Sequence, residues 1–109
     1  MLPRAFTAVI ERNATFDGAF TTEPYETAWA GDARWFVHVL DATPGAEIEF
    51  GAQVSPESLT WCDHESRKAT IKGKGMASIA VDLPGPWQRL SGTVRNGSVK
   101  VIMYLSLRG

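Results

Sequence analysis

The chain reads Val94-Arg95-Asn96-Gly97-Ser98-Val99-Lys100-Val101 near its C-terminal end, and this stretch predicts the fold class. Two runs of alternating apolar and polar residues, Gln88 to Arg95 and Ser98 to Leu107, meet there at the Asn-Gly pair. Both central residues of a type I′ turn need a positive φ, and Asn followed by Gly adopts it at low cost. We therefore expect an antiparallel β-hairpin over the last fifth of the chain.

The rest of the chain consists of further short runs with the two-residue period of β-strands. Turn signals such as Pro44-Gly45 and Pro84-Gly85-Pro86 separate them, and no long window keeps a helical period. The expected strands are Ala5 to Glu11, Glu26 to Ala30, Arg34 to Ala42, Glu47 to Val54, Leu59 to Trp61, Lys68 to Lys72, Met76 to Leu83 and the two arms of the hairpin. This spacing predicts an all-β fold, an antiparallel β-sandwich or jelly-roll-like structure of seven to eight short strands.

The cleanest alternations also predict the core. Its expected members are Ile48, Phe50, Val54, Ile79, Val81, Val99, Val101 and Leu105. The run Arg34 to Ala42 is apolar on both faces, which indicates a strand covered on both sides or one that meets a partner. The segment Asn13 to Pro24 is rich in turn-forming residues and is expected to be mainly loop.

Composition limits the function classes. A length of 109 residues with 44% hydrophobic residues predicts a single domain over residues 1–109, with residues 1–5 as an N-terminal arm. The net charge of -1 gives no overall field toward nucleic acid or an anionic membrane, so we expect neither as a partner. Cys62 is the single cysteine, so no internal disulfide forms, which fits assembly in a reducing cytoplasm. Met1 to Ala5 lack the apolar segment of a signal peptide, so we expect no export by that route.

Residues that could carry chemistry do not form a convincing constellation. The run Cys62-Asp63-His64-Glu65, with His38, could hold a metal, but a solvated turn gives the same pattern. Glu47 and Glu49 could form a glycosidase pair, but an exposed strand face also explains them. A nucleophilic triad has only two histidines to draw on and no Gly-x-Ser-x-Gly elbow. We therefore expect no catalytic residue, no metal, no cofactor and no enzymatic activity.

The tryptophans are the strongest candidates for a binding surface. Trp35 is expected in the core or at a subunit interface, and at least one of Trp29, Trp61 and Trp87 is expected to be partly exposed. Exposed rings could stack on a sugar or bury against another subunit. The N-terminal arm and the Asn13 to Pro24 segment lack the periodicity to fold alone and are expected to contact other subunits. The candidate interface residues are Met1, Leu2, Arg4, Trp29, Trp35, Trp61 and Trp87.

Four stretches carry a resemblance to a known group. They are Ala28-Trp29, Arg34-Trp35-Phe36-Val37-His38-Val39, the run Ile48 to Trp61, and Leu83-Pro84-Gly85-Pro86-Trp87-Gln88-Arg89-Leu90. From Ala28 to Leu107 the chain resembles small β-sandwich virion proteins of tailed bacteriophages and gene transfer agents. It differs in having Ser55-Pro56-Glu57-Ser58 where the group usually has a glycine in the loop.

The resemblance implies a non-enzymatic structural protein of the virion, assembled in the host cytoplasm. It would be a capsid decoration protein or another head or tail component, present in symmetric copies or as a homo-oligomer. The implied partners are the major capsid protein or tail subunits, with no cofactor. A carbohydrate-binding or receptor-binding β-sandwich module is the alternative, and the exposure of the tryptophans should separate the two.

Overall fold

The computed structural model describes residues 4–109, and this part of the chain contains strands but no helix. The strands are β1 (Ala5–Thr21), β2 (Tyr25–Glu26), β3 (Asp32–Ala42), β4 (Glu47–Ser55), β5 (Cys62–Asp63), β6 (Ala69–Lys72), β7 (Gly75–Asp82) and β8 (Trp87–Arg108). All pairings are antiparallel. The predicted all-β, antiparallel sandwich-like fold is therefore confirmed.

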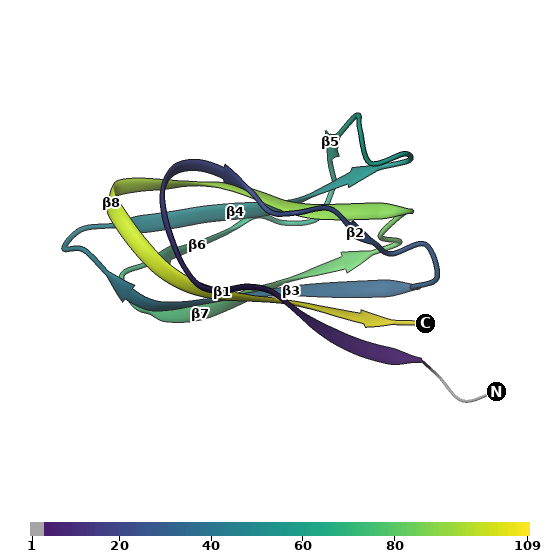
Figure 1. The fold of residues 1–109 in the computed structure, drawn as a ribbon, viewed down its shortest axis with the longest axis horizontal. Helices are drawn as coiled ribbons and strands as arrows, with labels where there is room; N and C mark the ends of the chain where they lie inside the picture. Colours follow the sequence, from purple (N-terminus) through teal and green to yellow (C-terminus); the bar gives the residue numbers. More distant parts are fainter. Residues whose placement is uncertain (1–3) are drawn as a thin grey trace.

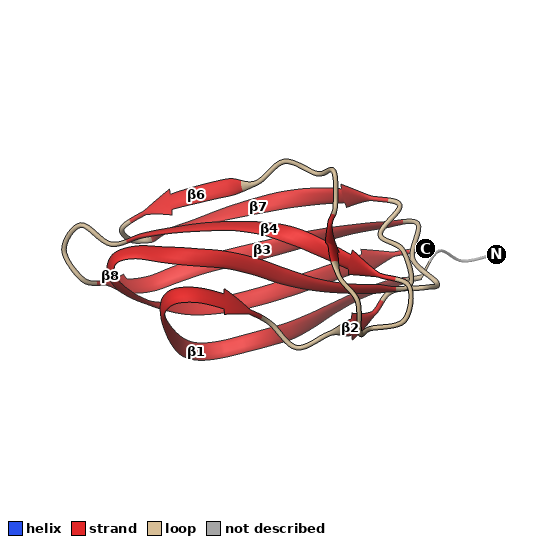
Figure 2. Cartoon of the chain, turned by 90° about the horizontal axis from the view of Figure 1, so that it is seen from above, coloured by secondary structure: helices blue, strands red, loops and turns tan. Residues whose placement is uncertain are grey.

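The strands form one sheet that curls over into two layers (Figures 1 and 2). One layer contains β4, the first half of β8, the second half of β1 and the short strands β5 and β6. The other contains β3, β7, the second half of β8 and the first half of β1. Apolar residues at alternate positions of both layers point inward and make up the core.

The Asn96-Gly97 pair does not close a hairpin, and that prediction is wrong. Both residues have the expected positive φ, 62° and 142°. However, the chain continues as the single strand β8, whose first half pairs with β4 and whose second half pairs with β3. Figure 1 shows β8 reversing at one end of the molecule as it passes between layers. The reversal was predictable, but the flanking arms find partners in other strands rather than in each other.

The segment Asn13 to Pro24 is mostly strand, which corrects its prediction as loop. Most of it belongs to β1, which follows β8 through the same reversal. Asn13 and Gly18 have positive φ values of 53° and 64°, and the register shifts near both. These bulges bend the strand, so turn-forming residues here mark a curved strand.

The remaining boundaries differ in smaller ways. The expected strand at Glu26 to Ala30 is reduced to β2, and Trp29 lies in a turn. Leu59 to Trp61, expected to be extended, lie in a loop, and β5 begins directly after them at Cys62. Leu83, the last residue of the strand expected at Met76 to Leu83, lies outside β7 with a φ of 51° and is 80% exposed.

The core agrees closely with its prediction. Of the eight expected members, all except Val54 are at most 5% exposed. Val54 is half-buried near the end of β4. Trp35 is fully buried, and its indole Nε1 donates a 2.8 Å hydrogen bond to Oε1 of Gln88 in the opposite layer. Gln88 Nε2 in turn donates to the carbonyl of Pro84 at 3.1 Å.

Candidate functional site: two outward faces of the sandwich

The outward face of the β1, β8, β3 and β7 layer is apolar at its centre. Partners directly opposite in an antiparallel pair share a face, and the register places Tyr104 between Val9 and Phe36, and His38 between Ile102 and Met76. We call the residues Val9, Phe36, Met76, Ile102 and Tyr104 the outer apolar face. The alternation in β3 thus gives it two apolar sides, as its sequence predicts.

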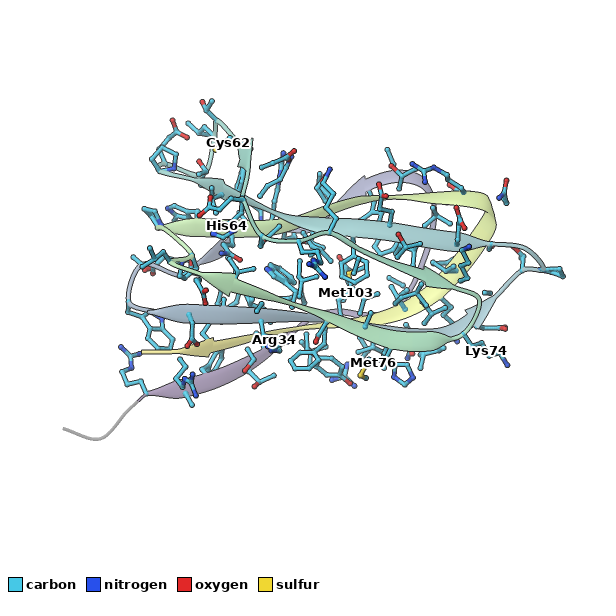
Figure 3. The ribbon with its side chains drawn as sticks, turned by 180° about the vertical axis from the view of Figure 1, so that it is seen from behind. Arg34, Cys62, His64, Lys74, Met76 and Met103 are labelled. Carbon is cyan, nitrogen blue, oxygen red and sulfur yellow. The ribbon has the colours of Figure 1, made fainter. Side chains whose placement is uncertain are left out.

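The side chains of the outer apolar face are open to solvent to different degrees. Met76 is 54% exposed and Val9 is 43% exposed, whereas Phe36, Ile102 and Tyr104 are half-buried between neighbouring strands. Figure 3 shows Met76 on the outer side of its layer, while Met103 lies between the layers. The sheet thus presents an apolar surface that contains the rings of Phe36 and Tyr104, with His38 between Ile102 and Met76.

Charges of both signs lie at one end of this layer. Asp32 accepts a 2.9 Å hydrogen bond from Arg108, and Arg34 donates one of 2.9 Å to the hydroxyl of Ser78. Asp32 also lies opposite Asp82 in the β3–β7 pair. The outer apolar face is thus bordered at one end by charged side chains, and a polar border around an apolar centre is usual in protein–protein contact surfaces.

The outward face of the β4 and β6 layer is polar. Arg89 Nε donates a 2.8 Å hydrogen bond to Gln53 Oε1, and Gln53 Nε2 donates one of 3.0 Å to Asp63 Oδ1. The Arg89 guanidinium lies 4.4 Å from the centre of the Trp61 ring. We call Gln53, Trp61, Asp63 and Arg89 the polar network. Because its members come from β4, β5, β8 and a loop, no local sequence signal connects them.

A tightly bonded loop holds Trp61 at this face. The Glu57 carboxylate accepts hydrogen bonds from the Thr60 amide at 2.7 Å, the Ser55 hydroxyl at 2.8 Å and the Leu59 amide at 3.2 Å. These bonds, that of Thr60 above all, lower the pKa of Glu57 below its ordinary value. The loop is therefore ordered by its own carboxylate.

The predicted interface residues are distributed over the molecule. Met1 and Leu2 lie outside the described residues. Arg4 lies over the half-buried Trp29, with its guanidinium 4.2 Å from the ring centre. Trp35 was expected either in the core or at a subunit interface, and its full burial places it in the core. Trp87 is half-buried at the start of β8, and with Trp29 and Trp61 it fulfils the expectation of partly exposed rings.

The residues considered for chemistry do not converge on one site. The His64 side chain bonds with both ring nitrogens, one 2.8 Å from the Asp82 carbonyl and the other accepting from the Ser66 amide at 2.9 Å. His38 lies on the other layer's outward face, opposite Ile102. Glu47 and Glu49 both face Arg95, at 3.9 and 3.8 Å. Within residues 4–109 no cluster of three or more His, Cys, Asp or Glu side chains is arranged to hold a metal ion.

The same described range holds no helix that is long and apolar enough to span a membrane.

Comparison with known proteins identifies the fold but no family. No protein-family model matches the sequence, and no curated protein matches it. The PBSX exported protein XepA shares the fold with a TM-score of 0.72 and 11% identity, over 94% of this chain and 36% of XepA. The SPBc2 prophage-derived protein YomS gives 0.69 and 8% identity, over all of this chain and 96% of YomS.

A virus particle also contains this fold. A chain of infectious bursal disease virus, Gx strain, matches with a TM-score of 0.57 and 10% identity, over 97% of this chain and 32% of the viral one. This chain therefore spans about a third of XepA and of the viral chain but nearly the full length of YomS. Identities this low show the fold alone, a β-structure found in phage-derived proteins and in a virus particle.

Proposed function

We propose that this chain is a non-enzymatic structural protein of a virion, a capsid decoration protein or another head or tail component. It assembles in the host cytoplasm and binds the major capsid protein or a tail subunit in symmetric copies. Neither nucleic acid nor membrane is part of the proposed contact. The shared fold of the two phage-derived proteins and the viral chain supports this proposal.

The outer apolar face is the observation that carries the proposal. Four strands at about 4.8 Å spacing and two rows of outward positions, about four residues at about 3.4 Å each, give it an extent of roughly 260 Å². That is about a third of the ~800 Å² that each partner buries in a stable standard-sized complex. A contact of this size is weak alone, but repetition by the symmetry of a particle adds many such contacts together.

The charges near this face favour a protein partner. Asp32, Asp82, Arg34 and Arg108 give the charged border both signs in equal number. A phosphate backbone or an anionic membrane would instead require a cluster of positive side chains. A protein partner can match the outer apolar face with apolar side chains and the neighbouring charges with charges of opposite sign.

Binding of variants to particles tests the proposal. Purified protein is mixed with particles that lack it, and copies per particle are counted after sedimentation. Phe36→Asp places a charge at the centre of the outer apolar face and should lower occupancy at least about tenfold, because the charge loses its hydration on binding. Met76→Asp changes a more exposed side chain and should weaken binding without disturbing the fold.

Thr70→Asp is the matched control, because Thr70 points outward from the polar layer. It should leave occupancy unchanged, and circular dichroism checks that every variant folds. The proposal is contradicted if the wild-type protein does not bind particles, or if Met76→Asp and Phe36→Asp bind as well as Thr70→Asp. Self-association without particle binding would also contradict it and would assign the face to a second copy.

A further inference from the structure

A depression lies on the polar layer, beside the polar network and away from the outer apolar face. Its volume is about 130 Å³. Its lining residues are Glu49, Phe50, Gly51, Asp63, Lys68, Ser91, Gly92 and Thr93. Gly51 lies at its floor, at an outward position of β4 that carries no side chain, and the stem of Lys68 packs over it. A Cβ added at Gly51 would lie only 2.9 Å from Lys68 Cγ.

The lining offers hydrogen-bond donors and acceptors in balance. Ser91 and Thr93 contribute hydroxyls, Glu49 and Asp63 contribute carboxylates, and Lys68 contributes an ammonium group. Arg95 lies 3.8 Å from Glu49 and offsets its charge. A phosphate or sulfate would face two carboxylates here, and an apolar side chain would meet polar walls. A neutral polyol both donates and accepts at each hydroxyl, so it matches this lining best.

The polar network extends this site toward an aromatic ring. Gln53 is two residues from Gly51 on the same outward side of β4, about 7 Å along the strand. Its amide is oriented at both ends, by Arg89 and by Asp63. Arg89 in turn supports one face of the Trp61 ring, which stays partly exposed. A platform fixed in this way loses little freedom when a ligand binds.

We propose that the depression at Gly51 and the ring of Trp61 together bind a neutral oligosaccharide. One sugar unit lies in the depression, with hydroxyls bonded to Asp63, Ser91 and Lys68, and the next unit packs against Trp61. The depression is smaller than the ~300 Å³ of an ordinary small-molecule pocket, so it takes one unit of a longer chain. This site is independent of the proposed virion contact, because it lies on the opposite layer.

The test uses a panel of immobilised neutral and sulfated glycans, followed by titration of each ligand found. The wild-type protein should bind neutral oligosaccharides. Trp61→Ala and Asp63→Ala should each weaken the affinity at least about tenfold, which corresponds to ~1.4 kcal/mol. Trp29→Ala is the matched control, because Trp29 is also half-buried beneath an arginine, but at a different place. It should bind glycans like the wild-type protein.

Amide chemical-shift changes on titration should be confined to β4, the first half of β8 and the segment from Trp61 to Lys68, which includes β5. The proposal is overturned if no neutral glycan binds at millimolar concentration, or if Trp61→Ala and Asp63→Ala bind like Trp29→Ala. Binding to sulfated glycans alone, lost with added salt, would also overturn it, since that pattern indicates attraction to basic side chains. Particle binding by Trp61→Ala, measured in parallel, distinguishes failure of this site from failure of the virion contact.

Discussion

Gln88 is the one glutamine in the core, and it connects the two layers through a side chain. It accepts from the Trp35 indole and donates to the Pro84 carbonyl, so three buried polar groups satisfy one another. A buried donor without an acceptor costs about 1–3 kcal/mol. Gln88 therefore explains how so large a polar-tipped ring as Trp35 can be fully buried.

Replacing Gln88 with leucine tests this link. Gln88→Leu should lower the free energy of unfolding by about 1–3 kcal/mol, because the Trp35 Nε1–H is left without an acceptor in the core. Denaturation by urea measures the change. Gln53→Leu is the control, since water can replace its bonds at the surface, and it should cost less than about 1 kcal/mol. Equal losses of unfolding free energy in the two variants would show that the buried bond contributes no more to stability than a surface bond.

Glu57 makes the loop before Trp61 sensitive to acid. Folding lowers its pKa, chiefly through the Thr60 amide bond, so the ionised carboxylate stabilises the folded loop. That stabilisation is complete above the pKa of an unfolded glutamate, about 4.3. It is lost as the pH falls through the lower pKa of the folded loop.

The amide resonance of Thr60 reports this transition. Followed from about pH 6 to about pH 2, it should shift with a midpoint below that of an ordinary glutamate. Glu57→Gln removes the titrating group and should abolish the shift. A midpoint at or above the ordinary glutamate value would contradict the bonding described for this loop.

At the scale of elements, β4 shows how far the alternation of a strand predicts burial. Phe50 is fully buried, and Phe50→Ala should lower the free energy of unfolding by about 3–5 kcal/mol. Val54 shares its inward side but is only half-buried. Val54→Ala should therefore cost less than about 1.5 kcal/mol. A loss below about 1 kcal/mol for Phe50→Ala in urea denaturation would show that the register of β4 is wrong.

The bend in β8 depends on Gly97. Its φ of 142° disfavours a side chain, and a Cβ there would collide with Thr43 Oγ1, which accepts a 2.9 Å hydrogen bond from the Ser98 amide. Gly97→Ala should lower the free energy of unfolding by about 3 kcal/mol. Gly45 also has a positive φ, 83°, but open space around its Cβ position.

Gly45→Ala is therefore the control for strain without collision, and it should cost about 1–2 kcal/mol. Thermal unfolding at a fixed protein concentration compares the two variants. If Gly97→Ala is as stable as Gly45→Ala, the result contradicts the close approach of Gly97 in β8 to Thr43 in the turn between β3 and β4.

The sequence predicts the local features of the fold better than it predicts which strands pair with each other. Strands, inward faces and the reversal at Asn96-Gly97 follow from period and backbone preference, which are properties of neighbouring residues. The partners of β8 do not, because Arg95 pairs across the sheet with Glu47 and Val99 with Ala42. Nothing local excludes the simpler hairpin.

The candidate sites likewise differ in whether the local sequence predicts them. The apolar outward side of β3 is visible in the sequence, because Phe36 and Leu40 alternate with the buried positions. The polar network is not visible, because Gln53, Asp63 and Arg89 meet only through the register of β4 with β5 and β8.

At the scale of the whole molecule, the two layers separate two proposed roles. The layer of β3 and β7 presents an apolar surface suited to another subunit, and the layer of β4 and β6 presents a polar surface suited to sugar. A protein held to a particle by the first would turn the second outward. Symmetric copies would then multiply a weak sugar affinity, as they multiply the weak subunit contact.

The orientation of the protein on a particle tests the central claim most directly. Particles are imaged by electron cryo-microscopy with and without this protein, and the difference density is fitted with the fold. We predict one density at symmetry-related positions, with Phe36, Tyr104 and Ile102 facing the neighbouring subunit and Trp61 facing solvent. Absence of difference density, or density with the outer apolar face turned to solvent, would contradict the account.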